Sequence, residues 1–224
     1  MTGGSTEESG GRSRRERLRA DTVEEIKRAA LGLIVERGAA NLRFADIART
    51  MGMTPPALYR YFADRDELLT ALVADSYDSL SDALTATRET VPPDDLDGRF
   101  VATCTAYRAW AQRNPEGFAL IFGSPVPGYA APPDGPTVVA GRRAMEHMVE
   151  LVADTAERGL FGSPLVPDGA EALMLAWATV HGFVTLEVHG HFHTLDQHAR
   201  DRLFAVQAGV AARTAGLSPA VDGR

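Results

Sequence analysis

The sequence has one cysteine, Cys104, among its 224 residues, so the chain cannot form an internal disulfide. Its stability must come from packing, and a reducing cytoplasm is the expected location. No apolar stretch follows the arginines near the N-terminus, which argues against a signal peptide. The longest strongly apolar run without a charge, 172–186, is shorter than the about 20 residues that cross a bilayer. We therefore expect a buried helix there and no membrane association.

The common enzyme motifs are missing as well. The sequence contains no Walker loop, nucleophile elbow, HExxH or GxGxxG pattern. An acid–base pair would have to come from residues such as His181 and Glu187, which are six positions apart and fall on nearly opposite faces of a helix. We expect no enzymatic activity and no cofactor.

The alternation of polar and apolar residues that is typical of strands is also absent, and apolar residues recur at spacings of three and four. This predicts an all-α chain, with a head of three helices near the N-terminus and a larger C-terminal helical domain. The expected boundaries are a disordered basic tail over residues 1–18, the head over 19–80 and the C-terminal domain over 81–216. The tail is expected to be disordered because it has almost no apolar residues.

The formal net charge is −7, but the charge is unevenly distributed. Residues 12–60 hold 11 Lys and Arg against 6 Asp and Glu, a balance of +5, which leaves −12 for the rest. This indicates a basic module on an acidic body, with a random fluctuation of surface charge as the alternative. The five arginines of residues 12–19 favour a weak, salt-sensitive contact with phosphates, the alternative being a solvated tail.

Turn residues divide the head into helices. The first helix is predicted to begin near Asp21 or Thr22 and to end at Gly38. A glycine turn at Gly52 joins two short helices, and a longer one follows from Asp64; the short ones are expected over Phe44–Met51 and Pro55–Phe62. Thr54 is the candidate N-cap of the second short helix, with Pro55 at its first position.

Two short helices joined by a glycine are typical of a helix-turn-helix. Leu58 and Phe62, four positions apart, point inward and fix the second helix to the first two. The outward residues combine small side chains, which allow close approach to a groove, with Tyr and Arg, which can donate to phosphates and base edges: Pro55, Pro56, Ala57, Tyr59, Arg60 and Tyr61.

The segment GMTPPALYRYFADRDELL resembles the signature of the TetR family of repressors, and the resemblance extends over Val23–Leu72. It implies an all-α homodimer. Each subunit would have a three-helix, helix-turn-helix DNA-binding head at one end and a larger C-terminal helical domain for ligand binding and dimerisation, with an effector pocket in this body. It also implies roles in DNA binding for residues around the turn and at the start of the next helix: Arg43, Phe44, Thr54, Pro55, Pro56, Tyr59, Arg60, Tyr61 and Arg65. One position departs from the family pattern, since Arg43 stands where Thr or Ser often caps the second helix.

A second resemblance concerns Trp177, His181 and Gly182, which match the Trp-His-Gly (WHG) motif of a C-terminal domain in one TetR subgroup. This helix is apolar nearly all round and must be covered on both sides. With the last helix it is expected to form a four-helix interface between two subunits; the candidates are Gly182, Leu186, Leu203, Phe204 and Val210. The alternative is a monomer whose central helix is wholly buried.

Large aromatic residues with a few polar groups suit a small-molecule pocket. The candidate lining residues, each of which could equally be ordinary core, are Tyr107, Trp110, Phe118, Phe122, Met148, Met174, Trp177 and His181. A proline-rich loop over residues 124–136 either covers the pocket or merely connects two helices.

Histidines gather at His189, His191 and His193, with His198 nearby. Alternate positions do not share a helical face and no cysteine or acidic cluster completes a ligand set, so we expect no metal site.

The resemblance and the residues together predict a repressor that binds a near-palindromic DNA operator as a homodimer and is released by an unknown small-molecule effector. Activation in place of repression is left open. The rival hypothesis is a metal- or metabolite-binding helical sensor with a non-functional DNA-binding head.

Overall fold

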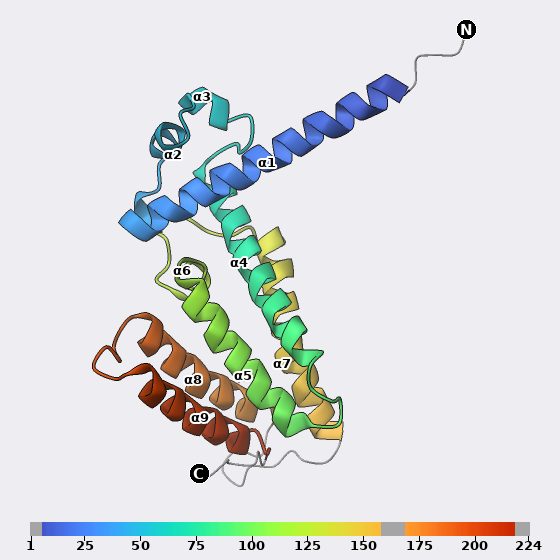
Figure 1. Cartoon of the computed structure of the whole chain (residues 1–224), viewed down its shortest axis with the longest axis vertical. Helices are drawn as coiled ribbons and strands as arrows, with labels where there is room; N and C mark the ends of the chain where they lie inside the picture. The colour runs from blue at the N-terminus through green and yellow to red at the C-terminus, as the bar shows by residue number, and fades with distance from the viewer. Residues whose placement is uncertain (1–5, 158–168, 218–224) are drawn as a thin grey trace.

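The structure, a computed structural model, describes residues 6–157 and 169–217, and every regular element in these ranges is helical (Figure 1). The prediction of an all-α chain is therefore confirmed. In order, the elements are α1 (Thr6–Arg37), a 3-10 turn η1 (Ala39–Asn41), α2 (Phe44–Thr50), α3 (Pro55–Leu58), α4 (Arg65–Arg88), α5 (Leu96–Arg113), α6 (Pro115–Phe122), α7 (Pro136–Glu157), α8 (Gly169–Val188) and α9 (Gln197–Thr214).

The first helix is much longer than the sequence predicts. α1 begins at Thr6, so the disorder expected up to residue 18 is wrong for residues 6–18; residues 1–5 lie outside the described part. Composition predicts disorder because the segment has no apolar surface to bury. Once residues 23–37 have formed a helix, however, each further residue extends it without the cost of a new nucleus, and Arg and Glu are good helix formers. The C-terminal end is as predicted, at Gly38 with φ 78°.

An aliphatic core holds the head together. One side of α1 packs against α2, α3 and the first half of α4 through side chains that are almost fully buried: Ile26, Ala30, Leu33, Ile34, Leu42, Phe44, Ile47, Ala48, Leu58, Phe62, Leu68, Leu69 and Leu72. The spacing of Ile26, Ala30 and Leu33 places them on one face of the helix, as expected for a helix that packs on one side.

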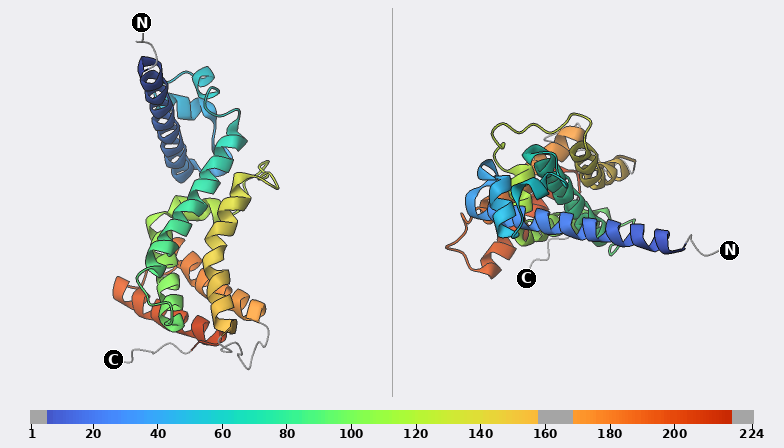
Figure 2. Two further views of the ribbon diagram at one scale, coloured as in Figure 1. Left: turned by 90° about the vertical axis from the view of Figure 1, so that its right-hand side faces the viewer. Right: turned by 90° about the horizontal axis from the view of Figure 1, so that it is seen from above.

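The same α4 continues into the body, where Leu80 and Leu84 belong to a second core (Figure 2). In the body α4 packs along α7 and α5, and α8 packs against α9. The head and the body therefore share one continuous helix of 24 residues.

The proline-rich loop after α6 contacts the head. Val126 and Tyr129 pack against the head core, and the hydroxyls of Tyr129 and Thr70 are 3.1 Å apart. Leu120 of α6 packs against the same core. The segment from α6 to this loop is thus a second connection between body and head, besides α4.

Candidate nucleic-acid interface and effector pocket

Gly52 makes the turn between α2 and α3. Its φ of 65° lies in the left-handed region, which glycine adopts without strain. The turn is closed by the amides of Gly52 and Met53, which donate to the carbonyls of Arg49 and Ala48 at 3.2 and 2.8 Å. The helix-turn-helix predicted from the sequence is present.

α3 is a helix of only four residues, followed by a turn over residues 59–61. Leu58 and Phe62, at 1% and 6% exposure, fix this segment to the head core as predicted. Thr54 precedes the helix, but its side chain makes no capping hydrogen bond. The reason is that Pro55 and Pro56 have no N–H to be capped, and the next amide, of Ala57, already donates to the Thr54 carbonyl at 2.9 Å.

The outer side of this segment is open to solvent. Thr54, Pro55, Pro56, Tyr59 and Arg60 are exposed, and Tyr59 retains 58% of its accessible surface. Tyr61 is half-buried, with the Arg19 guanidinium of α1 5.2 Å from the centre of its ring. The structure therefore leaves five of the nine predicted DNA-contacting residues exposed in this segment, and a sixth, Tyr61, half-buried.

The other three residues lie differently. The Phe44 ring is buried in the head core, with its centre 5.1 Å from that of Tyr59, so this side chain supports Tyr59 and is not itself exposed for contact with DNA. Arg43 is exposed just before α2 and its side chain makes no cap, as its residue type implies. The Arg65 guanidinium is directed inward and donates to the carbonyls of Ala39 and Ala40 at 2.9 and 3.3 Å. In this structure Arg65 fixes the start of α4 to η1.

In the body, five rings from three helices form one cluster. Tyr107 comes from α5, Phe118 and Phe122 from α6, and Trp177 and His181 from α8, with neighbouring ring centres 5.0–6.3 Å apart. The Tyr107 hydroxyl and His181 Nδ1 are 2.7 Å apart, and Trp177 stacks on His181 at 5.2 Å. These are five of the eight residues predicted to line a pocket.

The polar groups of this cluster are neutral near pH 7. Burial raises the pKa of Tyr107 and lowers the pKa of His181, so a neutral phenol faces a neutral imidazole. Burial also raises the pKa of the neighbouring Cys104 to about 12, which leaves its thiol protonated. The site can therefore offer hydrogen bonds but no charge.

A small apolar cavity, with room for little more than one water molecule, adjoins the cluster. Tyr107 and Trp177 line it, together with side chains from α4, α5, α7 and α8: Leu80, Leu84, Phe100, Thr103, Cys104, Ala144, Met145, Ala176 and Val180. Periodicity alone could not show that residues of α4 and α7 line the cavity. They do so because these helices face α5 and α8, and that arrangement depends on contacts between residues distant in the sequence.

Two of the predicted pocket residues lie elsewhere. Trp110 is buried beside α4, where its indole N–H donates to the Ser79 hydroxyl at 3.1 Å, and it faces a different cleft. Met174 is 64% exposed on α8, so its assignment to the pocket is wrong. Aromatic and methionine content alone does not distinguish these positions. The side chain of Met148 lies outside the described part.

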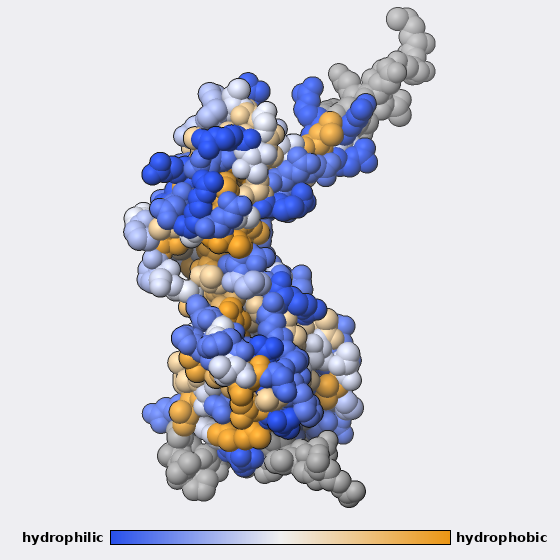
Figure 3. All heavy atoms as spheres, turned by 60° about the vertical axis from the view of Figure 1, so that its left-hand side comes forward, coloured by the Kyte–Doolittle hydropathy of each residue, from blue (hydrophilic) through white to orange (hydrophobic). Residues whose placement is uncertain are grey.

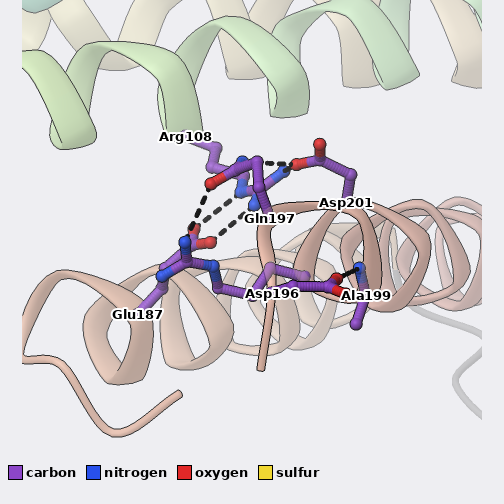
Figure 4. A network of polar contacts seen from close by, with 7 residues as sticks. Arg108, Glu187, Asp196, Gln197, Ala199 and Asp201 are labelled. Atoms are coloured by element: carbon purple, nitrogen blue, oxygen red, sulfur yellow. Dashed lines mark hydrogen bonds and ion pairs between the residues drawn. The ribbon is translucent and has the colours of Figure 1, made fainter. Parts of the chain in front are cut away.

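The sequence did not reveal a buried ion-pair network beside the cluster (Figure 4). Arg108 of α5 donates to both carboxylate oxygens of Glu187 on α8, at 2.6 and 2.5 Å, and to Asp201 on α9 at 2.7 Å. The guanidinium also lies 4.8 Å from the Phe204 ring. The Glu187 hydrogen bonds raise the pKa of Arg108, so this group is charged. The available signal was a lone glutamate at the end of an apolar helix.

The surface of α8 and α9 that faces away from the body is apolar. Leu186, Leu203 and Val210 are 44%, 46% and 38% exposed, and Gly182 has nothing within 4 Å of the position of a side chain. Phe204, also predicted for a subunit interface, is only 4% exposed and packs on Phe183 of its own chain. Its assignment to the interface is wrong.

The histidines near the end of α8 make local contacts. His189 Nδ1 is 2.7 Å from the Thr185 carbonyl and His193 Nδ1 is 3.1 Å from the Gly190 carbonyl. Among the described residues there is no group of three or more His, Cys, Asp or Glu side chains that could hold a metal ion.

Comparison with known proteins bears directly on this arrangement. Residues 26–72 match the model of the "Bacterial regulatory proteins, tetR family", and residues 100–210 match that of the "Tetracyclin repressor-like, C-terminal domain". The HTH-type transcriptional regulator Rv1816 of Mycobacterium tuberculosis is 36% identical over 202 residues, which cover 81% of this chain and 85% of the relative. The chain belongs to the TetR family.

Solved structures agree with this assignment. SCO4313, a protein described as regulatory, is 33% identical, with a TM-score of 0.72 over 88% of this chain and 97% of its own. PfmR, a TetR family transcriptional regulator from Thermus thermophilus, is 18% identical and shares the fold, with a TM-score of 0.63 over 83% and 96% of the two chains. The resemblances drawn from the two motifs are confirmed.

The chain is thus a DNA-binding transcriptional regulator. Members of this family bind DNA and function as dimers, and they are typically without enzymatic activity. Both family matches fall on the parts of the chain where the structure places the helix-turn-helix and the aromatic cluster.

Proposed function

We propose that this TetR regulator is a cytoplasmic repressor that a small, uncharged, largely apolar effector releases from a near-palindromic operator. Each subunit inserts α3 and the following turn into a major groove. Two-fold symmetry of the dimer makes the operator a pair of inverted half-sites. The observation that carries the proposal is the connection of an apolar pocket to an exposed recognition segment through shared helices.

Thr54, Pro55, Pro56, Tyr59, Arg60 and Tyr61 are the proposed DNA contacts. Proline side chains at the start of α3 suit contact with thymine methyl groups, while Tyr59 and Arg60 can donate to phosphates or base edges. Arg43 is exposed near α2 and is proposed to bind a phosphate. Arg65 acts indirectly, by fixing α4 against η1.

The exposed face of α8 and α9 is the proposed dimer interface. α8 is long and apolar enough to cross a membrane, by length and composition only. Only 28% of its apolar window is buried within the chain, so most of this apolar surface is left for another contact. Apolar residues gather over this part of the body (Figure 3), and the large exposed ones on α8 and α9 are Met174, Leu175, Leu186, Leu203, Val206 and Val210. Apolar surface on this scale is typical of an interface. Gly182, without a side chain, lets a partner helix approach closely.

The chemistry of the pocket defines the class of effector. No charged side chain lines the cavity, and the Thr103 hydroxyl already donates to the Arg99 carbonyl at 2.8 Å. A charged ligand would lose its hydration without gaining a partner. Tyr107, whose hydroxyl lies 2.7 Å from His181 Nδ1, is among the lining residues. The effector is therefore an apolar molecule with at most a hydroxyl, carbonyl or similar group near that pair.

Two elements can transmit the presence of the effector to the head. Leu80 and Leu84 of α4 line the cavity, and about two to three turns away the same helix supplies Leu72 to the head core. On α6, Phe118 and Phe122 belong to the aromatic cluster while Leu120 packs on the head. A ligand that moves α4 or α6 changes the separation of the two heads, and so favours the DNA-free state.

The DNA half of the proposal is tested by isolating genomic fragments that the purified chain retains and measuring their affinity by fluorescence anisotropy. Tyr59→Ala is expected to weaken binding to the selected operator by roughly 10-fold or more, on the scale of one lost base or phosphate contact. Its melting temperature should not change, because Tyr59 is exposed. Unchanged binding by this variant would contradict the groove assignment.

The effector half uses the fluorescence of Trp177 as a readout. The chain has two tryptophans, so the Trp110→Phe variant reports Trp177 alone. Uncharged aliphatic and aromatic compounds are titrated first into this variant and then into its operator complex. A compound that alters the fluorescence is expected to lower operator affinity. If compounds bind beside Trp177 and operator affinity does not change, the release mechanism is wrong.

A further inference from the structure

The N-terminal part of α1 extends beyond the head core. The first residues of α1 that pack on this core are Val23 and Ile26, and residues 13–21 are exposed. The helix nevertheless continues to Thr6 and stands clear of the other elements (Figures 1 and 2). Its N-terminal end lies at the same end of the molecule as α3, remote from α8 and α9. A helical segment without tertiary packing is only marginally stable in water. We therefore expect a contact with another molecule to stabilise it.

The side of α1 that is buried in the head changes from apolar to basic towards the N-terminus of the helix. Counting 3.6 residues per turn, Arg15 and Arg19 fall within about 40° of the stripe formed by Ile26, Ala30 and Leu33. Where the head ends, the apolar stripe therefore continues as an arginine stripe on the same side. Arg14 and Arg17 fall on the opposite side of the helix.

One contact fixes the direction of the arginine stripe. The Arg19 guanidinium lies 5.2 Å from the ring centre of Tyr61, in the turn directly after α3. Tyr61 is one of the residues proposed to reach DNA. The side of α1 that carries Arg15 and Arg19 is therefore continuous with the recognition segment.

These arginines are not neutralised by the protein. Within the described ranges neither Arg15 nor Arg19 takes part in an ion pair, and both are exposed. Guanidinium groups bind phosphate oxygens with two parallel hydrogen bonds. The two residues are one turn apart, a rise of about 6 Å, which allows each to engage a different phosphate.

We propose that the extension of α1 is a second DNA-binding element, which lies against the duplex beside the half-site and binds backbone phosphates through Arg15 and Arg19. The occupant of this surface is the DNA flanking the base pairs that α3 contacts. The proposal rests on DNA binding by the head and adds to it a contact that depends on operator length and salt, not on base sequence.

The test compares two double variants with the same change in charge on the same helix. Arg15→Gln/Arg19→Gln removes the proposed contacts, and Arg14→Gln/Arg17→Gln is the matched control on the opposite face. Glutamine has nearly the helix propensity of arginine, so neither variant should shorten α1. Each is measured by anisotropy against the selected operator over a range of salt concentrations, with the minimal site and with a site lengthened at both ends.

Four phosphate contacts per dimer should be lost in Arg15→Gln/Arg19→Gln. The slope of log affinity against log salt concentration should then be shallower by about 3 to 4, at roughly 0.9 per contact. The control should keep most of the wild-type slope. The wild type and the control should bind the lengthened site more tightly than the minimal one, and Arg15→Gln/Arg19→Gln should bind both equally.

The outcomes separate this inference from the function of the head. Equal slopes for the two double variants, whether both reduced or both unchanged, overturn the directed contact and leave operator binding intact. Failure of the wild type to select any operator would instead refute the proposed function. Loss of slope confined to Arg15→Gln/Arg19→Gln supports the second DNA-binding element.

Discussion

The head and the body are both helical, but different contacts stabilise them. In the head the core is almost wholly aliphatic and the polar side chains lie on the outside, around α3. In the body, polar and charged groups are buried among aromatic rings, as Arg108, Glu187 and the Tyr107–His181 pair show. A recognition surface needs a rigid support beneath it, whereas a pocket needs polar groups held in a low-dielectric interior. The difference follows from these two tasks.

The largest effect on stability is expected at the buried Arg108–Glu187 ion pair of the body. Glu187→Ala leaves the Arg108 charge buried with only Asp201, and should lower the free energy of unfolding by about 3–5 kcal/mol in urea denaturation at fixed dimer concentration. Asp201→Ala removes a half-exposed partner and should cost less than about 1 kcal/mol. Equal losses in the two variants would show that the Arg108–Glu187 pair is no more important than a surface pair.

An intermediate effect is expected at the junction. Leu120→Ala shortens the side chain by which α6 packs on the head while leaving Phe118 and Phe122 in the aromatic cluster. Operator affinity without effector should stay within about threefold, while release by an effector should weaken by roughly 10-fold, the scale of a coupling energy between sites. Ala119→Ser, at an exposed position of α6, is the matched control. If the effector releases Leu120→Ala from the operator as fully as the wild type, the contact of α6 with the head does not transmit effector binding, and α4 is the remaining connection.

The smallest effect concerns pH. All six histidines lie at or after position 147, so the head has none. Burial lowers the pKa of His181, and that of His147, in the folded chain. Below about pH 6.5 the unfolded chain binds protons that the folded chain does not, so the free energy of unfolding should fall as the pH decreases from 7.5 to 5.5. His181→Gln should reduce this dependence and keep the part due to His147. A flat profile in the wild type would contradict the burial of both groups.

The head could be predicted from the sequence because its determinants are local. Gly38 and Gly52 mark the turns, and Leu58 with Phe62 defines the inward face of α3 at a spacing of four. The positions in the head where the prediction differs from the structure also have local causes. The Phe44 ring is needed in the core, although the sequence places it on the DNA side. Thr54 makes no cap because the two prolines have no N–H and the Ala57 amide already donates to the Thr54 carbonyl.

The body could be predicted only in part. Residue type alone predicts which large side chains are candidates for the pocket. Trp177 lines the cavity and Met174, three positions away, is exposed, because only one side of α8 faces α5. The partner of Arg108 lies 79 positions away, and no local pattern indicates such a pair. Phe204 and Leu203 are adjacent and both apolar, yet one is buried and the other exposed.

The shared helix α4 has a consequence for building chimeric regulators. Its first half supplies Leu68, Leu69 and Leu72 to one core and its second half supplies Leu80 and Leu84 to the other. A graft that joins this head to a foreign body therefore has no flexible linker to cut, and a junction at residue 80 would fall inside a packed helix. The phase of that helix sets the rotation of the head on the body, so inserting or deleting one residue there would turn the reading surface by about 100°.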